Sequence, residues 1–179
     1  MSDPRDLWDG LWARLEDGVA SADAPARTLA LASARTGGCV AARMVILRGS
    51  DRAAPNMTIF TNAGSEKVTE LRDEPRAEIL LWDAGTSFQA RLPVTVDMAA
   101  GSRELWEALS PGQQLNYVPT PPPGSAIEAP HVPDASGPEA FLVLTARILS
   151  ADILDLSDLP HKRAQFHARD DFTGRWVAP

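Results

Sequence analysis

Arg43-Met-Val-Ile-Leu-Arg48, followed by Ile59-Phe-Thr-Asn62 and Ser65-Glu-Lys67, is the part of this sequence that says most about its fold. The first two segments have the apolar composition of strands, and Gly64-Ser65-Glu66 is typical of a helix start. Arginine, lysine and hydroxyl side chains near a helix N-terminus are groups that bind phosphate oxygens. We therefore expect a bound anion here, such as the phosphate of a nucleotide-like cofactor. The side chains expected to contribute are Arg43, Arg48, Thr61, Ser65 and Lys67.

Composition and charge describe one globular domain. The chain has 179 residues, of which 44% are hydrophobic and 23% are charged. The net charge of -7 argues against a nucleic-acid partner and gives no support to binding at an anionic membrane surface. No apolar run approaches the roughly 20 residues of a membrane span, and the N-terminus has no signal-peptide pattern. The one cysteine, Cys39, cannot form an intrachain disulfide and fits a reducing cytoplasm.

Several common catalytic motifs are missing from the sequence. There is no G-x-G-x-x-G and no P-loop, so neither a dinucleotide-binding fold nor a P-loop nucleotide site is indicated. The three histidines lack the spacing of a metal-ligand set, so we expect no metal site. They are His131, His161 and His167.

Hydrophobic periodicity predicts one N-terminal helix followed by many short strands. Apolar residues recur at every fourth position over residues 3–20, and a linker follows at 21–26. Two further helices are expected at 64–73 and 101–109, and irregular loops at 48–56 and 110–138. The expected strands are 28–34, 40–47, 57–61, 77–82, 88–98, 141–149, 153–156, 163–168 and 175–178. Many strands with few helices predict a closed β-barrel or a sandwich with helices packed outside.

The strand and helix-start segments belong to a longer series of blocks. Arg43-Met-Val-Ile-Leu-Arg48 is followed by Phe60-Thr-Asn62, Ser65-x-Lys67, Pro75-Arg-Ala77 and Gln89-x-Arg91. In order and approximate spacing these blocks resemble the pyridoxamine 5'-phosphate oxidase family, the FMN-binding split barrels. The segments His161-Lys-Arg163-Ala-Gln-Phe166 and Trp176-x-Ala-Pro179 are similar to the end of that family's chains. The resemblance covers about residues 27–179, and its first half is the more specific.

The resemblance implies a fold, a cofactor and an assembly. The fold would be mainly β (α+β), a split β-barrel of the FMN-binding type with helices packed outside. Residues 27–179 would form this FMN-binding domain, and residues 1–26 a preceding helix and linker, within a single domain overall. The cofactor would be FMN, held at the interface of a homodimer.

The resemblance also implies which residues hold the cofactor. Arg43 and Lys67 would bind the FMN phosphate, and Thr61 and Ser65 would add hydroxyl groups. The backbone from Met44 to Leu47 would face the flavin ring, with a glutamine of a neighbouring strand and a Gly-Ser pair of the partner subunit nearby. The full expected set is Arg43, Met44, Val45, Ile46, Leu47, Arg48, Phe60, Thr61, Ser65, Lys67, Gln89, Gly124 and Ser125.

The chain departs from the family pattern where the substrate would bind. Arg48 stands where the family has a lysine, and Glu66 replaces a basic residue beside Lys67. The helix after Gln89 lacks the arginine with which the family binds a substrate phosphate, and Gln165 stands where the family has a flavin-contacting arginine. The residues expected to meet substrate here are Arg48, Trp106 and Arg163.

By resemblance the protein is an FMN-dependent oxidoreductase. Hydride would pass from a small anionic substrate to flavin N5, and O2 or another acceptor would reoxidise the flavin. Oxidation of pyridoxamine phosphate itself is less favoured, because the substrate-binding arginine is missing. Two alternatives stay open: a non-catalytic carrier or sensor for flavin or pyridoxal phosphate, and a split barrel that has lost FMN. Glu66 and Gln165 are the evidence for the last of these.

Overall fold

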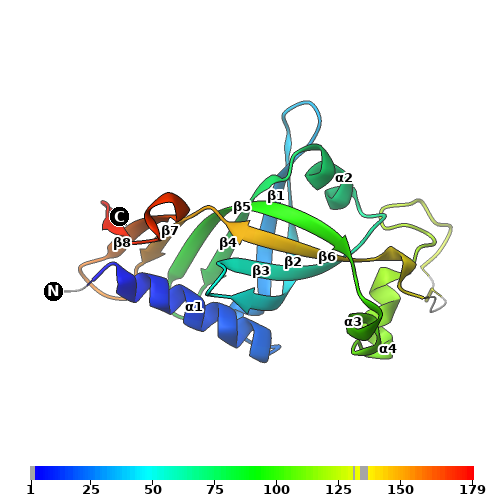
Figure 1. Cartoon of the computed structure of the whole chain (residues 1–179), viewed down its shortest axis with the longest axis horizontal. Coiled ribbons are helices and arrows are strands. Elements are labelled where there is room, and N and C mark those ends of the chain that lie inside the picture. The colour runs from blue at the N-terminus through cyan, green and yellow to red at the C-terminus, as the bar shows by residue number, and fades with distance from the viewer. Residues whose placement is uncertain (1–2, 131, 134–136) are drawn as a thin grey trace.

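The computed structural model describes residues 3–130, 132–133 and 137–179 of the chain. Six antiparallel strands follow one another in the order β4-β1-β2-β3-β6-β5, and β5 pairs with β4 to close a barrel (Figure 1). Helices lie outside it, so the expected mainly β architecture is confirmed. The barrel strands are β1 (Thr28–Ala34), β2 (Val40–Asp51), β3 (Asn56–Asn62), β4 (Arg76–Asp83), β5 (Phe88–Ala100) and β6 (Phe141–Ile148).

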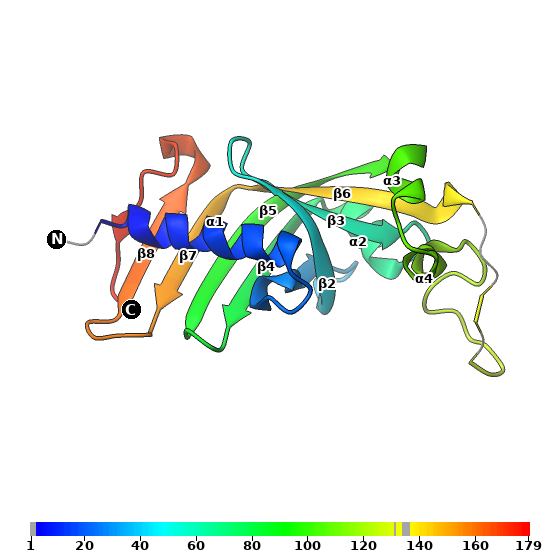
Figure 2. The ribbon, with the colours of Figure 1, turned by 90° about the horizontal axis from the view of Figure 1, so that it is seen from below.

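The longest strand, β5, carries the sheet beyond the barrel. Its residues Phe88–Arg91 pair with β7, whereas Val94–Ala100 pair with β6. Strands β7 (Ser150–Asp155), β8 (Lys162–His167) and β9 (Arg175–Trp176) thereby form an extension at one end of the molecule (Figure 2). The barrel and the extension thus share one continuous sheet.

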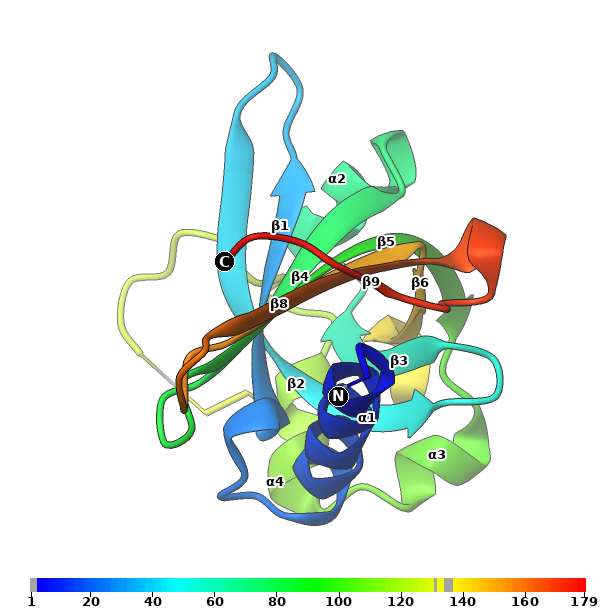
Figure 3. The same cartoon turned by 90° about the vertical axis from the view of Figure 1, so that its left-hand side faces the viewer.

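Helix α1 (Arg5–Ala20) packs its apolar stripe into the main core, as its periodicity predicts. Leu11, Trp12 and Leu15 are completely buried, and Trp8 stacks on Phe172 with ring centroids 4.6 Å apart. Each such leucine contributes about 1.5–3 kcal/mol through burial. Figure 3 shows this helix outside the ring of strands. No helix within the described ranges has both the length and the hydropathy needed to cross a bilayer.

The expected loop at 48–56 is wrong in its extent. Strand β2 continues to Asp51 and β3 begins at Asn56, so only residues 52–55 turn. The pairing shifts register between Leu47 and Gly49, and a side chain on Gly49 would come within 3.2 Å of Thr58. Because Gly49 has no side chain, β2 can continue through the register shift without a clash with Thr58. From the sequence, Arg48-Gly49 was expected to begin a loop.

The expected irregular segment 110–138 is partly helical. Ser110 and Gln113 form a reciprocal capping box that starts α4 (Pro111–Gln114), and a 3-10 turn follows at Leu115–Tyr117. Tyr117 then packs on Phe141 beside Trp106, which makes a second, smaller core. The remaining helices are α2 (Glu66–Asp73) and α3 (Arg103–Glu107), with 3-10 turns at Pro25–Arg27, Pro138–Ala140 and Ala168–Asp170.

Candidate functional site

A cleft of about 370 Å³ opens where β2 and β3 meet the start of α2 and the 3-10 turn after α4. One part of its lining is basic or hydroxylic, and another part is apolar. This is the division that a ligand with an anionic group and a flat ring would require. The lining residues are Met44, Val45, Ile46, Arg48, Phe60, Thr61, Asn62, Ser65, Lys67, Asn116, Tyr117 and Pro123.

Lys67 dominates the polar end of the cleft. Its ammonium donates to Thr61 Oγ1 at 3.2 Å, and Thr61 Oγ1 lies 3.3 Å from Ser65 Oγ. Burial, and then the charge of Arg43, lower the pKa of Lys67. Within the described residues Lys67 forms no ion pair with a carboxylate. A partly buried cation without a carboxylate partner would be stabilised by a bound anion.

Arg43 lies in an adjoining cavity of about 330 Å³, which shares Lys67 and Pro123 with the cleft. Its Nη2 donates to Glu70 Oε2 at 2.5 Å, and its Nη1 donates to Ser33 Oγ and to the Leu31 carbonyl. These bonds leave two of its five N–H groups, Nε–H and one on Nη2, without a partner among the described residues. Arg43 is thus oriented by its own chain and keeps donors for a ligand.

Glu70 is the buried carboxylate that holds this arrangement. It accepts hydrogen bonds from Ser33 Oγ at 2.6 Å, Arg35 Nε at 2.9 Å and Arg43 Nη2 at 2.5 Å. Burial alone would raise the pKa of Glu70, but these three donors outweigh it and lower the pKa to about 2. Glu70 therefore stays ionised at neutral pH and fixes both arginines on one edge of the cavity.

The apolar end of the cleft is formed by Phe60, Tyr117 and the outer face of β2. The Arg48 guanidinium lies over the Phe60 ring at 5.9 Å. Arg48 Nε is buried and has no hydrogen-bond partner within the described part of the chain. A buried unpaired N–H is costly, so this atom favours an acceptor supplied by a ligand or water.

Structural comparison places this architecture among known proteins, although no protein-family model and no curated protein matches the sequence. A pyridoxamine 5'-phosphate oxidase-related, FMN-binding protein from Nostoc punctiforme superposes with a TM-score of 0.79 at 23% identity, over 96% of this chain and 97% of that chain. The chain has the split-barrel fold of the pyridoxamine 5'-phosphate oxidase-related proteins. The expected resemblance is thereby confirmed for the fold.

Two further split barrels support the assignment. PhzG from Burkholderia lata, crystallised with tetrahydrophenazine-1-carboxylic acid, gives a TM-score of 0.71 at 19% identity, over 100% of this chain and 94% of that chain. A protein related to general stress protein 26 from Clostridium acetobutylicum gives 0.61 at 12% identity, over 96% and 100%. At these identities the shared property is the fold.

The split barrel gathers most of the expected cofactor residues at the cleft. Arg43 and Gly124 line the adjoining cavity, whereas three others line neither space. Leu47 is buried in the core, Gln89 lies on β5 opposite Trp82, and Ser125 is exposed in the proline-rich segment. The remaining expected residues, which line the cleft itself, are Met44, Val45, Ile46, Arg48, Phe60, Thr61, Ser65 and Lys67.

The expected substrate residues are not brought together within one chain. Arg48 lines the cleft, but Trp106 is only 7% exposed and packs on Phe141 in the small core. Arg163 lies on β8, in the sheet extension, and donates to Asp152 at 2.9 and 3.0 Å. A single chain therefore presents one of the three expected substrate contacts.

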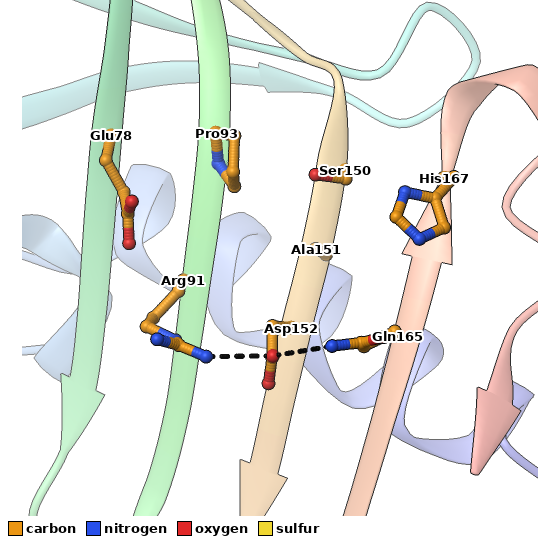
Figure 4. Close-up of a pocket in the computed structure, with 8 residues that line it drawn as sticks. All are labelled: Glu78, Arg91, Pro93, Ser150, Ala151, Asp152, Gln165 and His167. Atoms are coloured by element: carbon orange, nitrogen blue, oxygen red, sulfur yellow. Dashed lines mark hydrogen bonds and ion pairs between the residues drawn. The ribbon is translucent and has the colours of Figure 1, made fainter. Parts of the chain in front are cut away.

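A third cavity, of about 240 Å³, lies on this extension around Asp152 (Figure 4). Besides Arg163, Asp152 accepts hydrogen bonds from Arg91 at 2.8 Å and from Gln165 at 3.1 Å. Burial opposes ionisation, yet these donors lower the pKa of Asp152 to about 2. The aspartate is thus saturated by its own chain. The other ionisable side chains drawn around this cavity are Glu78, Arg91 and His167.

Neither of the two described histidines, His161 and His167, lines the cleft. Across the described ranges no group of three or more His, Cys, Asp or Glu side chains is placed to hold a metal ion. His161 is exposed after β7, and His131 lies outside the described residues.

Four cleft residues were not predicted as contacts: Asn62, Asn116, Tyr117 and Pro123. Asn62 belongs to the block that indicates the fold, and its amide links Val118 O, at 2.6 Å, to the Gly64 N–H, at 2.9 Å. The Ser110–Gln113 capping box could have revealed the helix before Asn116 and Tyr117. Nothing local in the sequence shows that the 3-10 turn after this helix lines the same cleft as β2.

Proposed function

We propose that the split barrel binds FMN in the cleft and acts as an FMN-dependent oxidoreductase. The observation that carries the proposal is the partly buried Lys67 at the polar end of the cleft, which has hydroxyl neighbours and no carboxylate partner among the described residues. The binding function is assigned to residues 27–179, and the exposed thiol of Cys39 suits a reducing cytoplasm as its compartment.

The residues present fit the cofactor at both ends. The cleft and the adjoining cavity, of about 370 and 330 Å³, offer space in the range of cofactor sites. Lys67 and the free N–H groups of Arg43 would hold the phosphate, with Thr61 and Ser65 as hydroxyl partners. Arg48 has a buried N–H that a polar edge of the ring would satisfy.

The chemistry that FMN would supply when bound is two-electron oxidation of a substrate by hydride transfer to the flavin ring, with O2 or another acceptor taking up the electrons. The chain itself would orient the ring against Met44, Ile46 and Phe60 and keep water from one side of it. Arg48, at the ring end, is the group placed to attract a small anionic substrate. No general base is required of the protein for this role.

A homodimer would complete the site. Large apolar side chains are exposed on the outer face of the sheet next to the cleft: Met44 is 63% exposed, Trp82 48% and Leu80 37%. Met44 and Leu80 flank Ala30 in register, so these residues form one apolar strip. Strips of this kind on soluble proteins are usually covered by a partner. A second copy would also supply expected contacts that line neither the cleft nor the adjoining cavity of their own chain, namely Gln89, Ser125 and Arg163.

The cofactor proposal is tested by absorbance near 450 nm and by titrating the apoprotein with FMN. We expect Arg43→Ala or Lys67→Ala to weaken FMN binding by about 1.5–3 kcal/mol, the usual contribution of a hydrogen bond to a charged group. Arg72→Ala is the control, because it removes an exposed cation from the same helix α2. A colourless wild-type protein that does not bind added FMN would refute the proposal.

The partner contribution needs a separate measurement. Sedimentation of the holoprotein should give a dimer, and Trp82→Glu should shift it toward monomers and weaken FMN binding. Changing Gly124 and Ser125 together should weaken FMN only if the partner's loop reaches the cofactor. Unaltered FMN affinity in a monomeric Trp82→Glu variant would show that one chain suffices.

A non-catalytic carrier or sensor is the second candidate, and the burial of Trp106 favours it because a substrate contact is then lost from the cleft. FMN that stays bound and is reduced by no candidate donor, including pyridoxamine and pyridoxine phosphates, would support this alternative.

A further inference from the structure

We propose that Arg35 is a third cation of the phosphate end of the site and makes it selective for a phosphorylated flavin. The inference rests on the proposed FMN function. Arg35 lines the adjoining cavity together with Arg43 and Lys67, although it lies outside every strand and helix. It follows directly after β1 and begins the turn of the β1–β2 hairpin, which rises beside α2 in Figures 1 and 3.

The hairpin fixes the position of Arg35. Its backbone N–H donates to the Cys39 carbonyl at 2.7 Å, and its own carbonyl accepts from the Gly38 N–H at 3.1 Å. Gly37 and Gly38 have φ values of 91° and 86°, which glycine adopts without strain, so the chain reverses tightly here. This short, hydrogen-bonded turn therefore places the Arg35 guanidinium at the edge of the adjoining cavity.

Two carboxylates hold the guanidinium, and they differ in exposure. Nε donates at 2.9 Å to Glu70, whose side chain is 8% exposed, whereas Nη2 lies 2.7 Å from Glu66, whose side chain is 70% exposed. Arg35 Nη1 forms no hydrogen bond within the described residues. The Glu70 bond thus aims the side chain, while the exposed Glu66 pair is weak and easily exchanged.

The charges around this cavity leave room for an anion. Arg35, Arg43 and Lys67 carry three positive charges against the two negative charges of Glu66 and Glu70. An incoming phosphate, which carries between one and two negative charges at neutral pH, would take the place of the Glu66 carboxylate on Arg35. The Glu66 carboxylate would turn into solvent, and this movement would cost little free energy because the side chain is already exposed. Arg35 would gain the phosphate as a bidentate partner.

This exchange predicts opposite effects of the two members of the pair. Arg35→Gln removes a phosphate donor and leaves Glu66 to repel the ligand, so FMN affinity should fall at least about tenfold. Glu66→Gln removes the competitor, so FMN affinity should rise. Riboflavin, which has the same ring and no phosphate, should bind all variants alike.

The test is a fluorescence titration of wild-type, Arg35→Gln, Arg35→Lys and Glu66→Gln apoproteins with FMN and with riboflavin. Arg103→Gln is the matched control, because it breaks another exposed arginine–glutamate pair, on α3. Arg35→Lys keeps the charge and should retain part of the FMN affinity. The Arg35→Lys variant also provides a second test if Arg35→Gln fails to fold. Unchanged riboflavin binding by Arg35→Gln would show directly that this variant is folded.

Selective loss of FMN affinity in Arg35→Gln supports the inference. FMN affinity equal to wild type, or equal losses for FMN and riboflavin in a folded Arg35→Gln protein, would overturn it while leaving the proposed function intact. A wild-type protein that binds neither flavin would overturn both, and the two failures are thereby distinguishable.

Discussion

Replacing Glu70 with glutamine should destabilise the apoprotein strongly and in a pH-dependent way. The pKa of Glu70 falls from 4.5 to about 2 on folding, which corresponds to about 3 kcal/mol of stability at pH 7. Glutamine resembles the protonated acid in shape, so Glu70→Gln should lose an amount of this order. The same change leaves Arg43 partly buried without its carboxylate, which adds in the same direction.

The sign of the pH dependence follows from the lowered pKa. A carboxylate with a depressed pKa contributes its full stability above the unfolded value of 4.5 and loses it as the pH falls toward about 2. At pH 3 about 1.5 kcal/mol of the contribution remains in the wild type. The difference between wild type and Glu70→Gln should therefore shrink from about 3 kcal/mol at pH 7 to about half of that at pH 3.

Urea unfolding of the two apoproteins at pH 7, 5 and 3 measures this difference, and the other carboxylates cancel because both proteins carry them. Glu74→Gln is the control: the pKa of Glu74 is also lowered to about 2, by Arg76, but that pair lies at the surface and water screens it. Glu74→Gln should leave the unfolding curve unchanged. Equal unfolding of wild type and Glu70→Gln at pH 7, or a gap that widens in acid, would refute the reasoning.

Two further predictions concern the cleft. Because the pKa of Lys67 is lowered, FMN affinity should weaken as the pH rises through that pKa. Lys67→Arg should remove this pH dependence. Parallel titrations with riboflavin, which lacks the phosphate, distinguish the effect of Lys67 from ionisation of the flavin ring. Asn62→Ala removes the amide between Val118 O and the Gly64 N–H and should cost about 1–3 kcal/mol in thermal or urea unfolding, whereas Asn56→Ala, which loses one exposed bond to a carbonyl, should change stability little. Equal effects of the two asparagine changes would contradict the role of Asn62.

The elements with a clear local signal were predicted well from the sequence. Alternating apolar residues located β1 and β4 within one residue of their observed ends, and fourfold spacing of leucines located α1. The predictions were wrong where the local sequence favours one structure and pairing or neighbouring segments impose another. Gly49 and Ser50 resemble a loop, yet pairing with β3 keeps them in a strand. Proline-rich composition between residues 119 and 138 hid the short helix α4 just before it.

The cleft likewise combines residues that the sequence could group with residues that only tertiary packing brings together. Thr61, Ser65 and Lys67 lie within seven residues of one another, so their grouping at a helix start was visible in the sequence. Tyr117 lies fifty or more positions further along the chain, and the packing of the second core on Phe141 brings it to the cleft. The burial of Trp106 in that core likewise depends on neighbours that no local pattern reveals.

The sequence by itself determined the strands, the helix start and the presence of a basic cluster, because these depend on residues close together along the chain. The tertiary structure decided which of those basic groups are free. Glu70 joins Ser33, Arg35 and Arg43 across up to 37 residues of chain and holds both arginines, whereas the one hydrogen-bond partner of the Lys67 ammonium among the described residues is a hydroxyl group. The reason is that an arginine or lysine is a potential ligand for an anion in any sequence, whereas its availability depends on the carboxylates that folding places within hydrogen-bond distance.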